Sequence, residues 1–243
     1  MSGTILITGA SSGIGRVTAE LFLQKGWTVG VLARRAEALA ELALAHDNVV
    51  VLPADVTDAA AVEKAFARFA QTAGRLDVLF NNAGAFGVAG TIDEIPLESW
   101  FEVVNVNLNG MFLCARAAFA LMRAQDPQGG RIINNGSISA YVPREGSICY
   151  TTTKHAITGM TRTLSLDGRA FDIACGQIDI GNARTPMVEA LAERARAAGQ
   201  PEPETMDVRH AAEAVLHMAE LPPEANVQFM TVMATKMPYI GRG

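Results

Sequence analysis

The stretch from Thr4 to Gly15 reads TILITGASSGIG: a short apolar run passes directly into a turn of glycines and small polar residues. The run has the length and composition of a buried strand, and the apolar spacing after Gly13 indicates a helix. Glycines in a strand-to-helix turn let the backbone approach a pyrophosphate group, which the positive end of the helix stabilises. A glycine triplet alone is common, but in a first strand–turn–helix unit it predicts a dinucleotide-binding domain.

The same alternation of short apolar runs and longer helical patterns continues along the chain. We expect strands at residues 4–8, 27–33, 49–53, 76–80, 131–135, 173–178 and 227–232, and helices at about 13–25, 37–45, 59–72, 97–123 and 147–170. Short strands that are apolar throughout are typical of parallel sheets buried on both faces. The pattern predicts an α/β fold: a Rossmann-type, doubly wound, seven-stranded, mostly parallel sheet with helices on both faces.

The domain organisation follows from the lack of a dividing segment. No linker rich in proline, glycine or serine interrupts the sequence, so we expect residues 1–243 to form a single domain. Residues 182–207 break the alternation with a short helical pattern at about 189–198. An insertion after the sixth strand lies at the edge where open α/β sheets bind ligands. We therefore expect a mobile substrate lid at about 182–207, with an ordinary surface loop as the alternative.

Composition and charge exclude several classes of protein. Of the 243 residues, 49% are hydrophobic and 19% are charged, which excludes a disordered chain. The net charge of −5, with no lysine and arginine cluster larger than a pair, argues against nucleic acid as a partner. No apolar run reaches the ~18 residues of a membrane helix. The first residues also lack the features of a secretory signal, so we expect a soluble, cytoplasmic protein.

Metal-binding and disulfide patterns are not recognisable in the sequence. Cys114, Cys149 and Cys175 are widely spaced and form no CxxC pair, and the four histidines share no ligand spacing. We therefore expect buried thiols, no disulfide framework and no metal site.

Gly9, Gly13 and Gly15 have the spacing GxxxGxG, which resembles the single-domain branch of the short-chain dehydrogenase/reductase family. Residues 81–84 match the NNAG motif of that family, and Asp55 and Val56 resemble its contact to the adenine ring. The resemblance runs from about residue 4 to residue 235 and implies a nicotinamide dinucleotide cofactor. The residues that it implies in cofactor binding are Gly9, Ser11, Ser12, Gly13, Ile14, Gly15, Arg34, Asp55, Val56, Asn82, Ala83, Gly84, Tyr150, Lys154, Gly181 and Thr185.

The end of the second expected strand bears on the choice of nicotinamide cofactor. A carboxylate there would bind a free ribose 2′-hydroxyl and repel a 2′-phosphate, whereas an arginine does the opposite. The sequence has Arg34 and Arg35 at this place and no carboxylate. Arg34 therefore favours NADP(H) over NAD(H), with Arg35 or Arg16 as possible assistants. The alternative is that Arg34 and Arg35 are only a solvated pair.

Tyr150 and Lys154 are four residues apart on an expected helix, so their side chains lie on one face. A nearby cation favours the phenolate form of a tyrosine, which helps the phenol to release and recover a proton near neutral pH. The resemblance implies that Tyr150 is the catalytic acid/base. It also implies that Lys154 supports the phenolate and holds the cofactor ribose.

Two polar residues complete the catalytic set that the resemblance implies. Ser137 follows the fifth expected strand, thirteen positions before Tyr150, where its hydroxyl can polarise and orient the same substrate oxygen. Ser139 is the alternative for this role. Asn107 matches the asparagine of the family that holds a proton-relay water, with Asn105 and Asn109 as close neighbours.

The segment after the sixth expected strand departs from the family pattern. The family usually has Pro-Gly there, whereas this chain has Ile180 before Gly181. Gly181 keeps the flexible position, and Thr185 fits the contact to the cofactor carboxamide. The departure at Ile180 concerns the local path of the loop and not the chemistry.

These observations together predict an NADP(H)-dependent oxidoreductase that interconverts a ketone or aldehyde with the corresponding alcohol. The alternative is a non-catalytic NADP(H)-binding sensor or scaffold of the same fold, since fold does not fix function. A small-molecule carbonyl or alcohol would be the substrate. The resemblance implies a homotetramer or homodimer in which the long helices pack across a two-fold axis.

Overall fold

The computed structural model describes residues 3–197 and 199–240, and its seven described strands form one sheet in the order β3-β2-β1-β4-β5-β6-β7. Every pairing in this sheet is parallel. The strands are β1 (Thr4–Thr8), β2 (Thr28–Ala33), β3 (Val49–Pro53), β4 (Val78–Asn81), β5 (Gly130–Asn135), β6 (Ile173–Gly181) and β7 (Phe229–Met233). The strand order reverses between β1 and β4, which makes a ligand crevice at their carboxyl ends. The predicted Rossmann-type fold is confirmed, and the sheet is parallel throughout where a mostly parallel one was expected.

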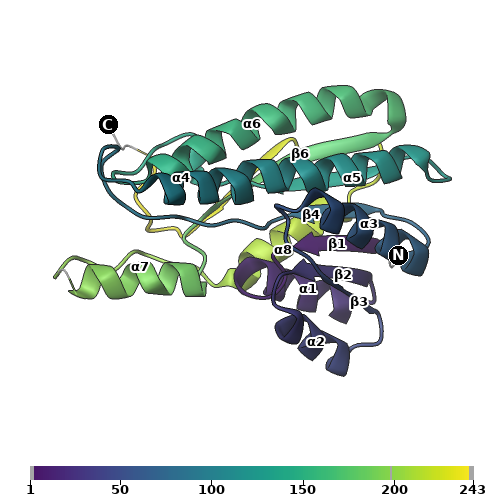
Figure 1. Ribbon diagram of the computed structural model, residues 1–243, viewed down its shortest axis with the longest axis horizontal. Coiled ribbons are helices and arrows are strands. Elements are labelled where there is room, and N and C mark those ends of the chain that lie inside the picture. Colours follow the sequence, from purple (N-terminus) through teal and green to yellow (C-terminus); the bar gives the residue numbers. More distant parts are fainter. Residues whose placement is uncertain (1–2, 198, 241–243) are drawn as a thin grey trace.

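Helices cover both faces of the sheet (Figure 1). They are α1 (Gly13–Gln24), α2 (Ala36–Ala45), α3 (Ala59–Ala73), α4 (Leu97–Val104), α5 (Met111–Ala124), α6 (Ile148–Gly168), α7 (Pro186–Ala197) and α8 (Val208–Ala219). Alternate strand residues serve the two faces: Ile5 and Ile7 pack into the core under α1, α2 and α8, and Leu6 into the core under α3 and α5. This alternation follows from the two-residue period of a strand.

The long helix expected at 97–123 is present, but its middle is wound differently. Residues Asn105–Gly110 form a π-helical turn between α4 and α5. A Cβ on Gly110 would lie 2.7 Å from Val56, so the helix and the loop after β3 approach closely here. The helix Leu97–Ala124 is long and apolar enough to cross a membrane by length and composition only, a test that the core helix of a soluble protein also passes. In this fold Cys114 and Met122 of that helix are buried in the core beneath it.

Strand β6 extends further than the sequence indicated. It was expected to end at residue 178, but it continues to Gly181, with Ile180 opposite Val232 and Gly181 opposite Met233. Beyond Ile178, which is opposite Asn135 of β5, this strand is paired with β7 alone. Ile180 therefore lies within the sheet, at the position where the family usually has proline.

Helix α8 was not among the expected elements, although the sequence carries a signal for it. The Asp207 side chain accepts a hydrogen bond from the backbone N–H of Arg209 at 2.8 Å, which caps the helix. Apolar residues then follow at helical spacing, and the side chains of Ala211, Val215 and Met218 are buried in the core beneath the helix.

The segment expected as a lid, residues 182–207, contains α7 and two connecting arms. Helix α7 begins at Pro186, earlier than the expected residue 189, because proline suits the first turn of a helix. The expected last residue, 198, lies outside the described residues. The arms pair at their base, where the N–H of Arg184 donates to the carbonyl of Met206 at 2.9 Å and the N–H of Met206 donates to Asn182 at 3.1 Å. From this base α7 projects beyond the body of the sheet (Figure 1).

Candidate active site

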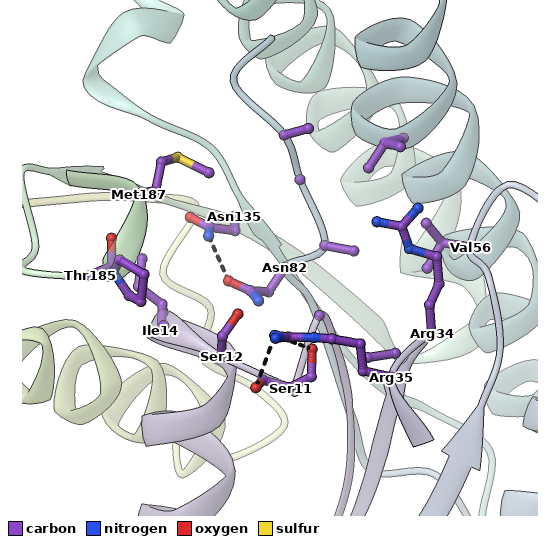
Figure 2. Close-up of a pocket in the computed structure, with 18 of the residues that line it drawn as sticks. Ser11, Ser12, Ile14, Arg34, Arg35, Val56, Asn82, Asn135, Thr185 and Met187 are labelled. Atoms are coloured by element: carbon purple, nitrogen blue, oxygen red, sulfur yellow. Dashed lines mark hydrogen bonds between the residues drawn. The ribbon is translucent and has the colours of Figure 1, made fainter. Parts of the chain in front are cut away.

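A cavity of about 410 Å³ lies at the carboxyl ends of the central strands (Figure 2). Its wall includes most of the residues predicted to bind the cofactor: Gly9, Ser11, Ser12, Gly13, Ile14, Arg34, Asp55, Val56, Asn82, Ala83, Gly84, Tyr150, Lys154 and Thr185. These residues come from the segments that follow β1, β2, β3 and β4, from the starts of α1 and α6, and from the residue before α7. The fold therefore brings together segments that are up to 176 positions apart, from Gly9 to Thr185.

The glycine-rich turn has the geometry that close approach of a phosphate requires. Gly9 and Gly13 have φ angles of +68° and +57°, in the left-handed region that glycine adopts without strain. Within the described residues, no side chain caps the start of α1 at Ser12, so the first backbone N–H groups of the helix are available to an anion. These features fit the pyrophosphate of a dinucleotide.

Gly15 is absent from the cavity wall and serves the packing beneath it. A Cβ on Gly15 would overlap the carbonyl oxygen of Gly9 and lie 2.6 Å from Nδ2 of Asn82. The third glycine is therefore required because the helix start packs directly against the turn.

We expect Gly15→Ala to lower the free energy of unfolding by roughly 1–3 kcal/mol, because the extra carbon meets backbone that cannot move aside. Gly159→Ala is the matched control, since Gly159 lies in α6 and a Cβ there meets no atom within 4 Å. That control should stabilise the protein by about 0.5–1 kcal/mol. Denaturant unfolding of both variants gives the comparison, and equal effects would contradict the packing role of Gly15.

A polar network ties the cavity floor together across the reversal point of the sheet. The hydroxyl of Thr8 accepts from the N–H groups of Asn82 and Ala83 at 2.8 and 2.9 Å, and the Asn82 amide donates to the Thr8 carbonyl at 2.9 Å. The Asn135 amide donates to Oδ1 of Asn82 at 2.8 Å (Figure 2). Thr8 and Asn135 were not among the predicted site residues. Each is a polar residue at the carboxyl end of a largely apolar strand, and this pattern could have identified them from the sequence.

The two arginines after β2 occupy different places at one end of the cavity. Arg35 donates to the hydroxyl and the carbonyl oxygen of Ser11 at 3.1 and 3.2 Å, whereas Arg34 extends past Val56 (Figure 2). Both side chains are exposed and line the cavity. Arg16 lies outside the cavity wall, where its guanidinium donates to Glu20 and to a carbonyl of α2.

Tyr150 and Lys154 project from the first turns of α6 into the same cavity. The Lys154 ammonium is 3% exposed, donates to the Asn135 carbonyl at 2.7 Å and lies 5.3 Å from the centroid of the Tyr150 ring. The Phe86 ring covers the Tyr150 ring at a centroid distance of 5.1 Å. The phenol and the buried ammonium therefore lie close together in one cavity.

Ser137 and Asn107 lie behind the cavity wall and are both buried. The Ser137 hydroxyl oxygen accepts from the N–H of Ser139 at 3.1 Å, and a hydroxyl group that accepts a hydrogen bond can also donate one. Asn107 accepts from the N–H of Ala85 at 2.7 Å and donates to the Ala85 carbonyl and to Thr153. Asn107 therefore joins the loop after β4 to α6. Among its neighbours, the exposed Asn109 donates to Asn105 instead.

Gly181 and Thr185 have different environments, although both were predicted to contact the cofactor. Gly181 is absent from the cavity wall, and it belongs to β6, where a Cβ would lie 2.8 Å from Cβ of Met233. The glycine serves close packing within the sheet, and the contact of Gly181 to the cofactor stays a prediction. Thr185 lines the cavity next to Gly13. A Cβ added at Gly13 would lie 3.5 Å from the Thr185 methyl group.

The possible metal ligands and the cysteines of the described residues are the groups that could form a second kind of site. No group of three or more histidine, cysteine, aspartate or glutamate side chains in residues 3–197 and 199–240 is placed to hold a metal. Cys114, Cys149 and Cys175 are buried and carry free thiols. Burial raises the pKa of Cys114 and of Cys175 to about 12, so both thiols stay protonated at neutral pH.

Comparisons with known proteins agree with the fold and the cavity. The family profile described as short chain dehydrogenase matches residues 3–196. The chain is 37% identical to the 2-(R)-hydroxypropyl-CoM dehydrogenase of Xanthobacter autotrophicus, with 78% of each chain covered. It is 34% identical to a 3beta-hydroxysteroid dehydrogenase of Mediterraneibacter gnavus, over 76% of this chain and 67% of that one. The solved closed form of a serine dehydrogenase complexed with NADP+ superimposes with a TM-score of 0.89 at 25% identity, over 99% of this chain and 98% of that one. The chain belongs to the short-chain dehydrogenase/reductase family of oxidoreductases, which act on hydroxyl and carbonyl groups.

Proposed function

We propose that the protein is an NADP(H)-dependent oxidoreductase that interconverts a ketone or aldehyde with the corresponding alcohol, with Tyr150 as the acid/base. The observation that carries this proposal is that Tyr150 and Lys154 share one cavity with the glycine-rich turn. A protein that only bound the dinucleotide could use the buried ammonium to hold the ribose, but it would have no use for the phenol beside it. The proposal therefore takes an enzyme over a non-catalytic sensor or scaffold.

Different residues of the cavity would bind the different parts of the dinucleotide. The turn from Gly9 to Ile14 would hold the pyrophosphate, Lys154 the ribose and Thr185 the carboxamide. When bound, the nicotinamide ring would supply or accept the hydride at the carbonyl carbon.

Two residues of the chain, Tyr150 and Ser137, act on the substrate oxygen, and Lys154 acts through Tyr150. Tyr150 donates its phenolic proton to the carbonyl oxygen during reduction and takes it back during oxidation. Lys154 stabilises the phenolate that remains, and Ser137 donates a hydrogen bond to the same oxygen. Asn107 would hold the water through which the proton on Tyr150 is replaced.

The choice between the two nicotinamide cofactors depends on the end of β2. Related folds have been solved with NADH as well as with NADP+, so the fold itself does not choose. Arg34 supports NADP(H), because an exposed guanidinium in the cavity wall can form charge-assisted hydrogen bonds with a 2′-phosphate. Arg35 already binds Ser11, so we assign Arg34 the main role and Arg35 a supporting one.

We expect Arg34→Asp to weaken NADPH binding about 10- to 100-fold relative to NADH, which corresponds to the ~1.5–3 kcal/mol of a hydrogen bond to a charged group. Calorimetric titration with each cofactor measures this ratio without a known substrate. Arg68→Asp on the exposed side of α3 makes the same change of charge away from the cavity and should leave the ratio unaltered. An unchanged ratio in Arg34→Asp would show that Arg34 and Arg35 are a solvated pair.

The remaining expectations concern the whole molecule and extend the proposal. We propose one catalytic domain that acts in the cytoplasm on a small-molecule carbonyl or alcohol, with residues 182–207 as a lid over the cavity. Met187 of α7 lies in the cavity wall, which supports such a lid. Leu97, Phe101 and Phe112 are exposed on the long helix α4–α5, which supports a homotetramer or homodimer packed through that helix.

A further inference from the structure

A buried carboxyl group lies directly behind the turn that carries Ser137. Asp179 of β6 is 0% exposed, and its Oδ1 accepts from the backbone N–H of Ser137 at 2.8 Å. The same oxygen accepts from the side-chain amide of Gln177 at 2.8 Å. A Cβ on Gly136 would overlap this oxygen, so the carboxyl group packs against the backbone just before the serine.

The carboxyl group interacts with both ends of the turn. Ser137 begins the short 3₁₀ turn Ile138–Ala140, and Tyr141 ends it. The Tyr141 hydroxyl interacts with Asp179, and burial together with this carboxyl group raises the pKa of Tyr141 to about 12. Tyr141 therefore stays protonated and can act as a donor to Asp179. One side chain of the neighbouring strand thus contacts both ends of the turn, beside the backbone hydrogen bond from Gly136 to the carbonyl of Ile178 at 2.8 Å.

The same network reaches the helix that carries the catalytic pair. The Gln177 amide donates to the Thr158 hydroxyl at 3.1 Å, and the Thr161 hydroxyl donates to Oε1 of Gln177 at 3.1 Å. Both threonines belong to α6, on the turns that follow Tyr150 and Lys154. Asp179 thus joins the turn of Ser137 to the helix of Tyr150 through a chain of buried hydrogen bonds.

Burying a carboxyl group is costly, and a neutral side chain would fill this space at lower cost. Burial raises the pKa of Asp179, and the hydrogen bonds from Gln177 and Ser137 act in the opposite direction. Strained or costly groups of this kind are typical of sites that must hold a precise geometry.

We propose that Asp179 is a positioning residue. It accepts a hydrogen bond from the backbone N–H of Ser137 and so holds the Ser137 hydroxyl at the correct place relative to Tyr150. This inference rests on the proposed carbonyl chemistry and adds a residue to it. Without the acceptor, the N–H of Ser137 is left buried without a partner and the turn shifts. A shift of about 1 Å in a group that contacts the reacting oxygen costs on the order of 100-fold in rate.

The test compares Asp179→Ala and Asp179→Asn in carbonyl reduction, NADPH affinity and thermal unfolding. We expect Asp179→Ala to lower kcat about 10- to 100-fold with the NADPH dissociation constant unchanged. Asp179→Asn keeps an acceptor oxygen and should restore kcat to within about threefold of the parent enzyme. If Asp179→Ala does not fold, Asp179→Leu removes the acceptor without leaving a hole.

A double variant tests whether Asp179 acts through Ser137. In a Ser137→Ala background, Asp179→Ala should cause no further loss of kcat, since groups that act as one unit are not additive. Thr161→Val is the control, because it breaks the buried network one step further away and should lower stability with little change in kcat.

Four results would overturn the inference: an unchanged kcat in Asp179→Ala, no restoration by Asp179→Asn, an additive loss in the double variant, or an equal loss of kcat in Thr161→Val. A parent enzyme that binds NADPH but reduces no carbonyl would instead overturn the proposed function, and this inference with it.

Discussion

Replacing Tyr150 with phenylalanine should lower kcat for carbonyl reduction by about 10³-fold and leave NADPH affinity nearly unchanged. General acid–base catalysis contributes roughly 10²–10⁴-fold to a rate, and Tyr150 is the phenol that the cavity wall presents beside a buried cation. The ring itself should stay in place, because its packing against Phe86 does not involve the hydroxyl. The measurement is steady-state reduction together with calorimetric titration of NADPH.

Tyr239→Phe makes the same chemical change at a partly buried tyrosine near the C-terminal segment and should leave kcat unchanged. If Tyr150→Phe kept more than about a tenth of the parent kcat, a phenolic proton would not be the one transferred, and the acid of the reaction would have to be sought elsewhere in the cavity.

The second large effect is expected at Lys154. We expect Lys154→Met to lower kcat by about 100-fold or more, because the change removes the cation that favours the phenolate of Tyr150. It should also weaken cofactor binding, unlike Tyr150→Phe, since Lys154 is proposed to hold the ribose. The Asn135 carbonyl loses its donor, so a loss of stability of roughly 1–3 kcal/mol should accompany the change.

Lys64→Met is the matched control, because Lys64 is exposed on α3 and the chain has only four lysines. The kinetic constants and the unfolding free energy of both variants are measured on the same preparation. A Lys154→Met protein with parent-like kcat, after correction for unfolded protein, would contradict the role of the ammonium.

The parts of the fold that were predicted from sequence are those that short-range patterns specify. The alternation of Ile5, Leu6 and Ile7 between the two cores needs only the two-residue period of a buried strand. The glycine-rich turn was recognisable because Gly9 and Gly13 must adopt positive φ, which few other residues allow. Helix α8 had a local signal too, in its cap at Asp207, so its omission was an avoidable error.

Other features depend on partners that are distant in the sequence. Strand β6 continues through Ile180 because β7 pairs with it, and the nearest partner, Val232, lies 52 positions away. The place of Gly181 in that sheet, and its absence from the cavity wall, follow from the same pairing. The contact between Asp179 and Ser137 joins β6 to the turn after β5 through one side chain and one backbone amide, which no spacing rule reveals.

In the candidate site, too, local motifs could be predicted and contacts between distant residues could not. The sequence identified Tyr150, Lys154 and most of the cavity wall through motifs, and the structure brings these residues together. Thr8 and Asn135 were missed because hydrogen bonds between strand ends, and not a motif, give them their place. The roles assigned to Ser137 and Asn107 stay predictions, because each lies behind the wall and would act on groups bound in front of it.

The most direct test of the central claim is the oxidation of NADPH, followed by its absorbance, with a panel of ketones, aldehydes and quinones. The parent protein and Tyr150→Phe are assayed side by side, with NADH in parallel. We predict consumption of NADPH that depends on the carbonyl compound, is slower with NADH and is lost in Tyr150→Phe. Tight binding of NADPH without consumption by any carbonyl compound would contradict the account and would favour a protein that senses the cofactor.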